Sequence, residues 1–220
     1  MAYRQRTIAV IGLGTFGKAV ARELTRVGDR VLGIDINPKR VADLADEIDS
    51  TLQADTTDIK ALRQCGLDSF DSVVVAIGRV MDASILTALN ILELGFKNVW
   101  VKAQSFRHEK ILKAIGVENI IQPESEYGYR LAQIIHNPLV KDYLSLNPDV
   151  FIVQMAVPHS LIGQTLETLK LRKKFNVKCA GIVCGDEVRV NNCERHLLEN
   201  GEDILIVGTR PDIRHFADSL

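Results

Sequence analysis

Three glycines and one carboxylate near the start of the chain have the types and spacing needed to hold a nucleotide. The segment Gly12-Leu-Gly14-Thr15-Phe16-Gly17 has the pattern G-x-G-x-x-G, and Asp35 follows 18 residues after the last glycine. In this pattern the first glycine permits a tight turn, the second lets the backbone approach a phosphate, and the third allows close helix–strand packing. A strand-end carboxylate can accept hydrogen bonds from ribose hydroxyls. These residues predict a nucleotide site, against the alternative of a glycine turn that only packs a helix on a sheet.

No recognisable catalytic set accompanies this motif in the sequence. The histidines are scattered, at His108, His136, His159, His196 and His215. The sequence has no Ser-His-Asp order, no H-E-x-x-H segment, no metal-ligand cluster and no P-loop. A nucleotide site without a proton-transfer group favours a sensor or regulatory subunit over an enzyme. The alternative is a small NAD(P)-dependent oxidoreductase, which would need a catalytic acid or base over the nicotinamide.

The elements that must position the motif alternate between strand and helix. An apolar run over 7–12 precedes the glycines, helical spacing follows over 18–27, and a strand over 30–35 ends on the carboxylate. Further strands are predicted over 51–54, 72–77, 98–102 and 118–121, with helices over 38–48, 58–65, 81–94 and 106–115. Such βαβ units with right-handed crossovers predict a Rossmann-like α/β fold, a doubly wound parallel sheet with its ligand at the carboxyl ends of the strands.

The pattern changes after Glu124. A helix over 126–136 is expected to leave the sheet, and Asn-Pro pairs mark both ends of the stretch that follows. Beyond it, strands are predicted over 151–157, 177–183, 187–190 and 203–208, with helices over 166–175 and 210–220. We therefore expect a nucleotide-binding domain with its crossover helix over 1–136, a linker over 137–147 and a small α+β lobe over 148–220. A lobe of this size has a limited core and often pairs with a copy of itself.

The composition is that of an ordinary globular protein, with 220 residues, 46% hydrophobic, 25% charged and a net charge of −1. That charge gives no sign of a nucleic-acid or lipid-surface binder. No apolar run approaches the about 18–20 residues of a membrane-spanning helix, and no signal-peptide core is present. We therefore expect a cytoplasmic protein with reduced cysteines, in which Cys179 and Cys184 are small core residues and Cys193 is a candidate exposed thiol.

Further segments of the chain resemble the RCK (regulator of potassium conductance) family. They are residues 9–14 with Phe16-Gly17, then 31–37, 76–78, 83–84, 99–104 and 120–124, followed by 161–166 and 203–208 near the C-terminus. The likeness covers essentially the whole chain. It is closest to the cytosolic gating subunits of Ktr-type potassium uptake systems, with TrkA-type proteins more distant. It implies an RCK N-lobe followed by an RCK C-terminal lobe, and a regulatory rather than enzymatic role.

The resemblance also implies ligands and partners. In proteins of this family eight subunits, built up from dimers, form a ring beneath a membrane potassium channel, and ATP or ADP at the N-lobes changes the shape of the ring. By position, the ribose would be held by Asp35, Ile36 and Asn37. The adenine region would be lined by Asp55, Thr56, Ile77, Gly78 and Arg79. The groups near the phosphates would be Lys102, Gln104, His108 and Glu124, the last beside a cation such as magnesium at a subunit interface.

Two positions depart from the family pattern. Thr15 stands where the family often has an arginine that reaches the γ-phosphate, and a hydroxyl cannot supply that charge. Asp55 stands where a neutral amide is usual. The preference among ATP, ADP and NAD(H) therefore stays open. Some relatives bind cyclic di-AMP between paired C-lobes, near positions that match Ile162, Arg172 and Asn192, although Asn192 stands where proline is frequent.

Three of these side chains have plainer interpretations. Glu124 precedes a helix, where a carboxylate is favourable next to the helix N-terminus without any ligand. Lys102 could be a solvated strand-end lysine. Arg79 could be an ordinary surface arginine.

Overall fold

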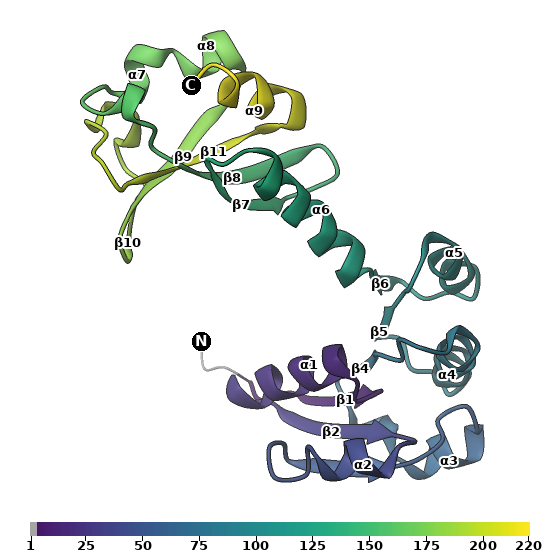
Figure 1. The fold of residues 1–220 in the computed structure, drawn as a ribbon. Coiled ribbons are helices and arrows are strands. Elements are labelled where there is room, and N and C mark those ends of the chain that lie inside the picture. The colour runs from purple at the N-terminus through teal and green to yellow at the C-terminus, as the bar shows by residue number, and fades with distance from the viewer. Residues whose placement is uncertain (1–3) are drawn as a thin grey trace. The chain divides into compact units, whose positions relative to one another are not determined.

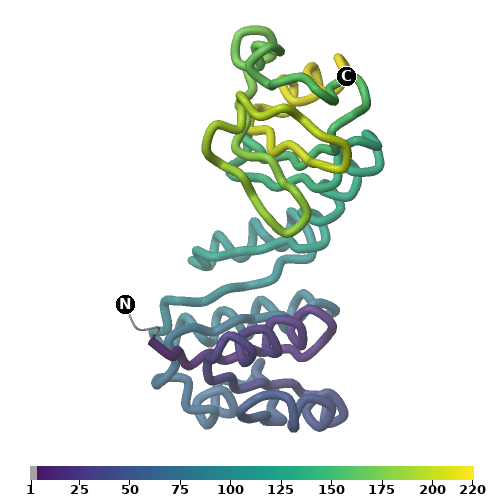
Figure 2. The backbone as a smooth tube through the Cα atoms, turned by 90° about the vertical axis from the view of Figure 1, so that its left-hand side faces the viewer, coloured from purple at the N-terminus to yellow at the C-terminus, as the bar shows by residue number. Residues whose placement is uncertain are grey.

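The computed structural model describes residues 4–220, which form two compact units. The first unit ends at Glu124, and the second comprises Ser125–Leu220. Figure 2 traces the chain from the first unit, purple through blue to teal, into the green and yellow second one. Within residues 4–220, no helix combines the length and the apolar character that crossing a membrane requires.

The first unit is built on a six-stranded parallel sheet with strand order β3-β2-β1-β4-β5-β6 (Figure 1). Its strands are β1 (Thr7–Ile11), β2 (Arg30–Asp35), β3 (Ser50–Gln53), β4 (Ser72–Val75), β5 (Val99–Lys102) and β6 (Asn119–Ile121). The order reverses at β1, because the chain runs outward to β3 and then returns to the other side of β1. The carboxyl ends of β1 and β4 therefore border the crevice in which such sheets bind ligands. The predicted Rossmann-like sheet is confirmed.

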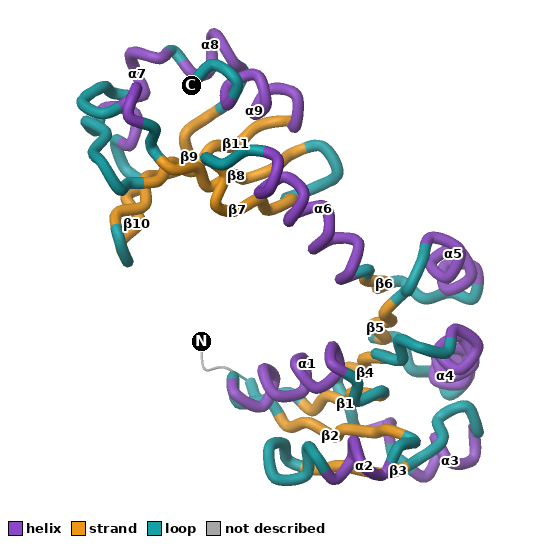
Figure 3. Tube along the Cα trace, in the orientation of Figure 1, coloured by secondary structure: helices purple, strands orange, loops and turns teal. Residues whose placement is uncertain are grey.

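Helices connect the consecutive strands of this sheet (Figure 3). They are α1 (Thr15–Arg26), α2 (Pro38–Ala42), α3 (Ile59–Gln64), α4 (Met81–Glu93) and α5 (Phe106–Ala114), with a short 3-10 turn η1 (Leu67–Ser69). Asn37, Asp58 and Ser105 start three of them, because each side chain accepts a hydrogen bond from a first-turn N–H group. The sequence therefore specifies where these helices begin.

Helix α2 is shorter than predicted. It ends at Ala42, whereas the apolar spacing extends to Ile48. After Ala42 the backbone continues in tighter turns, in which Leu44 N–H donates to Val41 O at 3.3 Å and Glu47 N–H to Leu44 O at 3.0 Å. Leu44 and Ile48 are still buried. The spacing thus predicted burial correctly and secondary structure only in part.

Alternate residues of β1 face two different cores. Ala9 and Ile11 pack with residues of α3, α4 and α5, among them Leu112. Ile8 and Val10 pack with α1 and with the turns after α2. Since successive side chains of a strand point to opposite faces, helices cover both faces of this sheet.

The second unit is built on a five-stranded antiparallel sheet of order β10-β9-β11-β8-β7. Its strands are β7 (Val140–Ser145), β8 (Val150–Ala156), β9 (Lys178–Cys184), β10 (Glu187–Arg189) and β11 (Asp203–Thr209). Its helices are α6 (Pro123–His136), which begins at the end of the first unit, α7 (Leu166–Leu169), α8 (Leu171–Phe175), α9 (Arg210–Ala217) and the 3-10 turns η2 (His159–Leu161) and η3 (Cys193–Arg195). The predicted α+β character and the hairpin between β9 and β10 are confirmed.

Three local expectations in this unit differ from the structure. The range 137–147, expected as a linker, contains β7, and the units divide after Glu124 rather than after residue 136. The register shift between Val140 and Asp142 interrupts the alternation by which a strand is recognised. The predicted helix over 166–175 is split at Lys170, whose φ of 52° is left-handed. Cys193, the candidate exposed thiol, is buried.

Candidate nucleotide-binding site

Each of the three glycines of the motif is at its position for a different structural reason. Gly12 has a φ of 94°, and a Cβ there would lie 2.9 Å from the backbone of Ala76. A Cβ on Gly17 would lie 1.9 Å from Gly12 O, so helix and loop can approach only without one. A Cβ on Gly14 would meet nothing within 4 Å. Packing therefore requires Gly12 and Gly17, whereas Gly14 leaves an open position.

The N-terminus of α1 lies at this open position. Gly14 is its N-cap and brings no side chain, and the first turn of the helix holds no acidic residue. The first backbone hydrogen bond runs from Lys18 N–H to Gly14 O at 2.9 Å. The N–H groups of Thr15, Phe16 and Gly17 precede it, and first-turn amides of this kind are suited to a phosphate.

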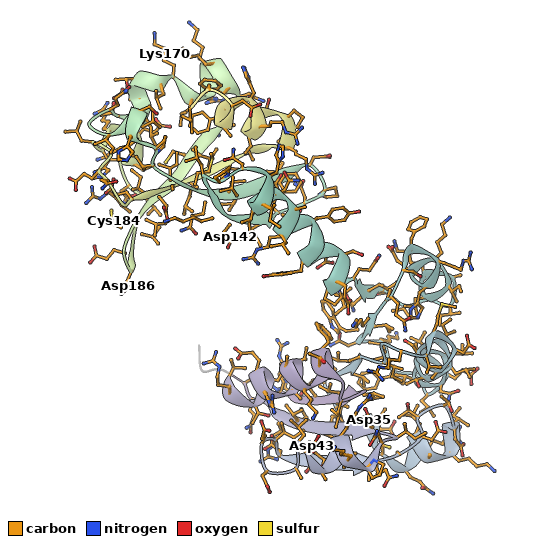
Figure 4. All side chains as sticks on the ribbon, in the orientation of Figure 1. Asp35, Asp43, Asp142, Lys170, Cys184 and Asp186 are labelled. Atoms are coloured by element: carbon orange, nitrogen blue, oxygen red, sulfur yellow. The ribbon has the colours of Figure 1, made fainter. Side chains whose placement is uncertain are left out.

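Asp35, labelled in Figure 4, is the last residue of β2 and forms a hydrogen bond with the glycine loop. It is 5% exposed. Its Oδ2 accepts a hydrogen bond from Leu13 N–H at 2.7 Å and lies 3.2 Å from Arg40 Nη1, while its Oδ1 accepts from Asn37 N–H at 2.8 Å. Spacing predicted the strand-end carboxylate but gave no signal for Leu13 and Arg40, because those contacts depend on how the loop folds back.

Four further residues predicted to hold the ribose and adenine, Ile36, Asn37, Asp55 and Thr56, lie after β2 and β3. Ile36 is 61% exposed, so its apolar side chain is available to a ligand. The Asn37 side chain caps α2. Asp55 Oδ1 accepts hydrogen bonds from the N–H and the hydroxyl of Thr57, at 3.0 and 2.6 Å. The carboxylate at position 55 is thus already engaged within its own loop.

Thr56 has a structural contact that sequence reasoning missed. It is buried, and its hydroxyl forms a hydrogen bond of 2.8 Å with the hydroxyl of Thr87 in α4. Asn90 of the same helix donates to the backbone carbonyls of Thr56 and Thr57 at 3.3 and 2.9 Å. Thr56 therefore attaches the loop after β3 to α4.

Lys102 is a buried cation at the end of β5, with 7% of its surface exposed. Its Nζ pairs with the Glu124 carboxylate and lies 5.4 Å from the centre of the Phe16 ring. A Cβ on Gly78 would lie 3.3 Å from this Nζ. The hydrogen bond from Lys102 lowers the pKa of the Glu124 carboxyl, whose side chain is 69% exposed. The structure thus brings together four of the residues predicted separately: Phe16, Gly78, Lys102 and Glu124.

The remaining predicted residues lie after β4, after β5 and in α5. His108 is fully buried, and its Nδ1 accepts a hydrogen bond from Gln104 N–H at 3.2 Å. Burial lowers the pKa of His108, so the imidazole is neutral at neutral pH. Gln104 is exposed. Of the two residues that follow β4, Ile77 is half-buried and Arg79 is exposed. His108 therefore holds the loop after β5 in place.

Known proteins resemble this chain in sequence and in fold. Residues 8–123 match the TrkA-N domain family. The chain is 35% identical to the Ktr system potassium uptake protein C of Bacillus subtilis (strain 168), with 96% of each chain covered. It is also 35% identical to the Ktr system potassium uptake protein A of Vibrio alginolyticus, with 98% of each covered.

The crystal structure of the GsuK RCK domain has a similar fold, with a TM-score of 0.62 at 13% identity. The match covers 98% of this chain and 47% of that one. Sequence and fold thus agree on the same group. The chain belongs to the TrkA-N family, as a relative of Ktr potassium uptake proteins with the RCK fold.

Proposed function

We propose that the chain is a nucleotide-sensing regulatory subunit that gates a membrane potassium uptake channel, with ATP and ADP as its ligands. Ktr potassium uptake proteins match it almost end to end, which supports a role in potassium uptake. The observation that carries the nucleotide part is the open position at Gly14, at the start of the helix whose Phe16 ring lies 5.4 Å from the ammonium of the buried Lys102. A phosphate bound there would meet both the first-turn amides of α1 and an ammonium group.

The ion pair between Lys102 and Glu124 would be the part of the site that responds to the ligand. A phosphate competes with the Glu124 carboxylate for the Lys102 ammonium, because both are anions beside one buried cation. A carboxylate released in this way can bind a divalent cation such as Mg²⁺, which prefers oxygen ligands. Glu124 lies in the first turn of α6, which continues into the second unit, so the exchange occurs where the two units join in sequence.

In this proposal the chain acts within a homo-oligomeric ring, octameric and built from dimers, on the cytoplasmic side of its channel partner. A nucleotide can switch such a ring only if it binds one conformation more tightly than another. Nearly complete conversion from one conformation to the other needs an affinity ratio of about 10⁴. A nucleotide with a smaller ratio between its affinities for the two conformations would change the open fraction without fully opening or closing the channel.

Thermal unfolding with ATP, ADP, NAD⁺ and NADH, each with and without Mg²⁺, tests the ligand, and light scattering after size-exclusion chromatography tests the ring. Stabilisation by ATP or ADP that Gly14→Ala removes, together with a mass near eight subunits, would support the proposal. Stabilisation by NADH alone, with hydride transfer to a small substrate, would favour an oxidoreductase. The proposal would be contradicted if none of the four nucleotides stabilised the protein, or if the protein stayed a monomer or dimer.

A further inference from the structure

Three side chains outside the nucleotide crevice meet in the second unit, at the base of the β9–β10 hairpin. Cys184 Sγ lies 2.7 Å from Glu202 Oε1, and His196 Nε2 lies 2.8 and 3.0 Å from the two carboxylate oxygens of Glu202. One ligand atom from each residue falls within 4.8 Å of the others. We propose that Cys184, His196 and Glu202 bind a divalent transition-metal ion of the zinc type.

The backbone brings these residues together from three separate segments. Asp203 of β11 pairs with Val183 of β9 in antiparallel register, which places Glu202 beside Cys184 at the end of the ladder. His196 follows η3 and directly precedes the bridge between Thr165 and Leu197. Figure 4 shows Cys184 where the hairpin leaves the body of the unit and Asp186 at its tip. The site is therefore built on strand ends and a bridged loop.

The observed distances are close to those that zinc imposes. Bonds of about 2.3 Å to sulfur and about 2.0–2.2 Å to nitrogen and oxygen place tetrahedral ligand atoms about 3.3–3.6 Å apart. The hydrogen-bonded atoms of the cluster would need to separate by less than about 1 Å to admit the ion. Three protein ligands leave the fourth position of a tetrahedral site to water.

The chemistry of the donors favours zinc over magnesium or calcium. A thiolate and an imidazole are soft or borderline ligands, whereas magnesium and calcium prefer oxygen. A thiolate and a carboxylate together also balance the charge of a divalent ion. The Glu202 side chain is 8% exposed and that of His196 14%, so the ion would replace protons in a mostly enclosed cluster. Glu199 N–H donates to Glu202 Oε2 at 2.9 Å and orients the carboxylate.

Arg189 is the group that the metal must displace. Its guanidinium contacts His196 Nδ1, and because arginine only donates, this contact places the imidazole proton on Nε2. A metal on Nε2 would leave the neutral imidazole with its proton on Nδ1, where it would face a second donor, so the guanidinium must turn away. Arg189 is exposed on β10, so it can turn into solvent without unfolding the sheet. Removing the Arg189 side chain should therefore leave zinc affinity equal to or greater than that of the wild type.

The test uses the untagged full-length chain, with Zn²⁺ affinity measured by competition with a chromophoric chelator and Co²⁺ used as a spectroscopic probe of thiolate ligation. We expect one Zn²⁺ per chain and a thiolate-to-Co²⁺ absorption band. Cys184→Ser should abolish the band. It should also lower zinc affinity by more than about 10–100-fold, which is the effect of losing a residue that only supports a ligand. Cys193→Ser, which alters a buried thiol of the same unit outside the cluster, is the matched control and should bind like the wild type.

Thermal unfolding without metal shows whether each variant is folded, and His196→Gln gives an independent ligand substitution if Cys184→Ser is not. Absence of stoichiometric zinc, equal losses in Cys184→Ser and Cys193→Ser, or weaker binding by Arg189→Ala would overturn the proposal. The result is independent of the nucleotide site, because all three ligands lie in the second unit. ADP binding should be the same in wild type and Cys184→Ser.

Discussion

At the scale of single residues, Asp35 has observed structural contacts and a proposed ligand-binding role, and two substitutions can separate the two. Asp35→Ala removes the acceptor for Leu13 N–H, which should lower the free energy of unfolding by about 1–3 kcal/mol. Asp35→Asn keeps an oxygen for that N–H and should cost less. If Asp35 binds the ribose, both substitutions should weaken the binding of ADP by about 2–3 kcal/mol, as measured by calorimetry. A folded Asp35→Asn protein with unchanged ADP affinity would exclude the ribose contact.

Thr15 offers a second residue-scale prediction. It is exposed in the first turn of α1, and the proposed site puts the γ-phosphate of ATP within reach of an added cation there. Thr15→Arg should raise ATP affinity by about tenfold or more relative to ADP, a difference of about 1.4 kcal/mol. Thr15→Gln, long but uncharged, is the control and should leave the ratio unchanged. If arginine strengthens ADP as much as ATP, position 15 does not face the γ-phosphate.

His108 gives a prediction for pH. Burial lowers its pKa in the folded chain, so below about pH 6.5 the unfolded chain binds a proton that the folded chain does not. Its contribution to the free energy of unfolding is therefore constant above that pH and falls as the pH drops, by at most about 1.4 kcal/mol per unit. His108→Asn, which keeps an acceptor near Gln104 N–H, should flatten denaturant-measured stability between about pH 5 and 6.5. Parallel pH profiles for the two proteins would show that His108 does not titrate this way.

At the scale of elements, the junction of β1 and α1 predicts opposite outcomes for two glycines three residues apart. Gly17→Ala should destabilise the first unit strongly, because its Cβ would overlap Gly12 O and push the helix from the loop. Gly14 has an ordinary φ of −72° and open space where a Cβ would lie, so Gly14→Ala should change the melting temperature little. It should nevertheless lose nucleotide binding, because the methyl group occupies the position that a phosphate would approach. Comparison of melting temperature with ADP affinity checks both, and undiminished ADP binding by Gly14→Ala would move the phosphate elsewhere.

The same elements show what sequence can and cannot reveal. β2, with bounds Arg30–Asp35, and the start of α4 at Met81 were predicted correctly, because period, capping and turn residues are local signals. The break at Lys170 was missed, since a left-handed lysine has no local signature. In the site, the glycines and the strand-end positions of Asp35 and Lys102 were predictable. The contact between Thr56 and Thr87 was not, because tertiary packing sets it across 31 residues.

The zinc-type cluster illustrates the same limit. Cys184, His196 and Glu202 are separated by 12 and 6 residues and fit no metal-binding motif, so the sequence showed no ligand cluster. Only the antiparallel register of β9 and β11 places Glu202 beside Cys184. The spacing of residues along one helix or strand can be recognised in the sequence. Which residues become neighbours across a sheet depends on the strand register, which the sequence pattern does not determine.

At the scale of the whole molecule, each unit has its own core, so substitutions should act on one unit at a time. Leu112→Ala in the first core and Met155→Ala in the second are matched truncations of fully buried side chains. Each should lower the stability of its own unit by about 2–5 kcal/mol. Hydrogen exchange read by mass spectrometry should show faster exchange in that unit, with ADP protecting only the first. Equal acceleration in both units by either variant would mean that the chain unfolds as one cooperative body.

The central place of β11 in the second sheet has a consequence for how the chain is made. β11 pairs with β8 on one side and β9 on the other, yet it is the last strand to be synthesised in the described chain. All six strands of the first sheet are complete by Ile121, so that unit can fold while translation continues. The second sheet lacks its central strand until Asp203–Thr209 leaves the ribosome, and until then β8 and β9 expose unpaired edges. A nascent chain stalled before residue 203 should therefore contain a folded first unit attached to an aggregation-prone remainder.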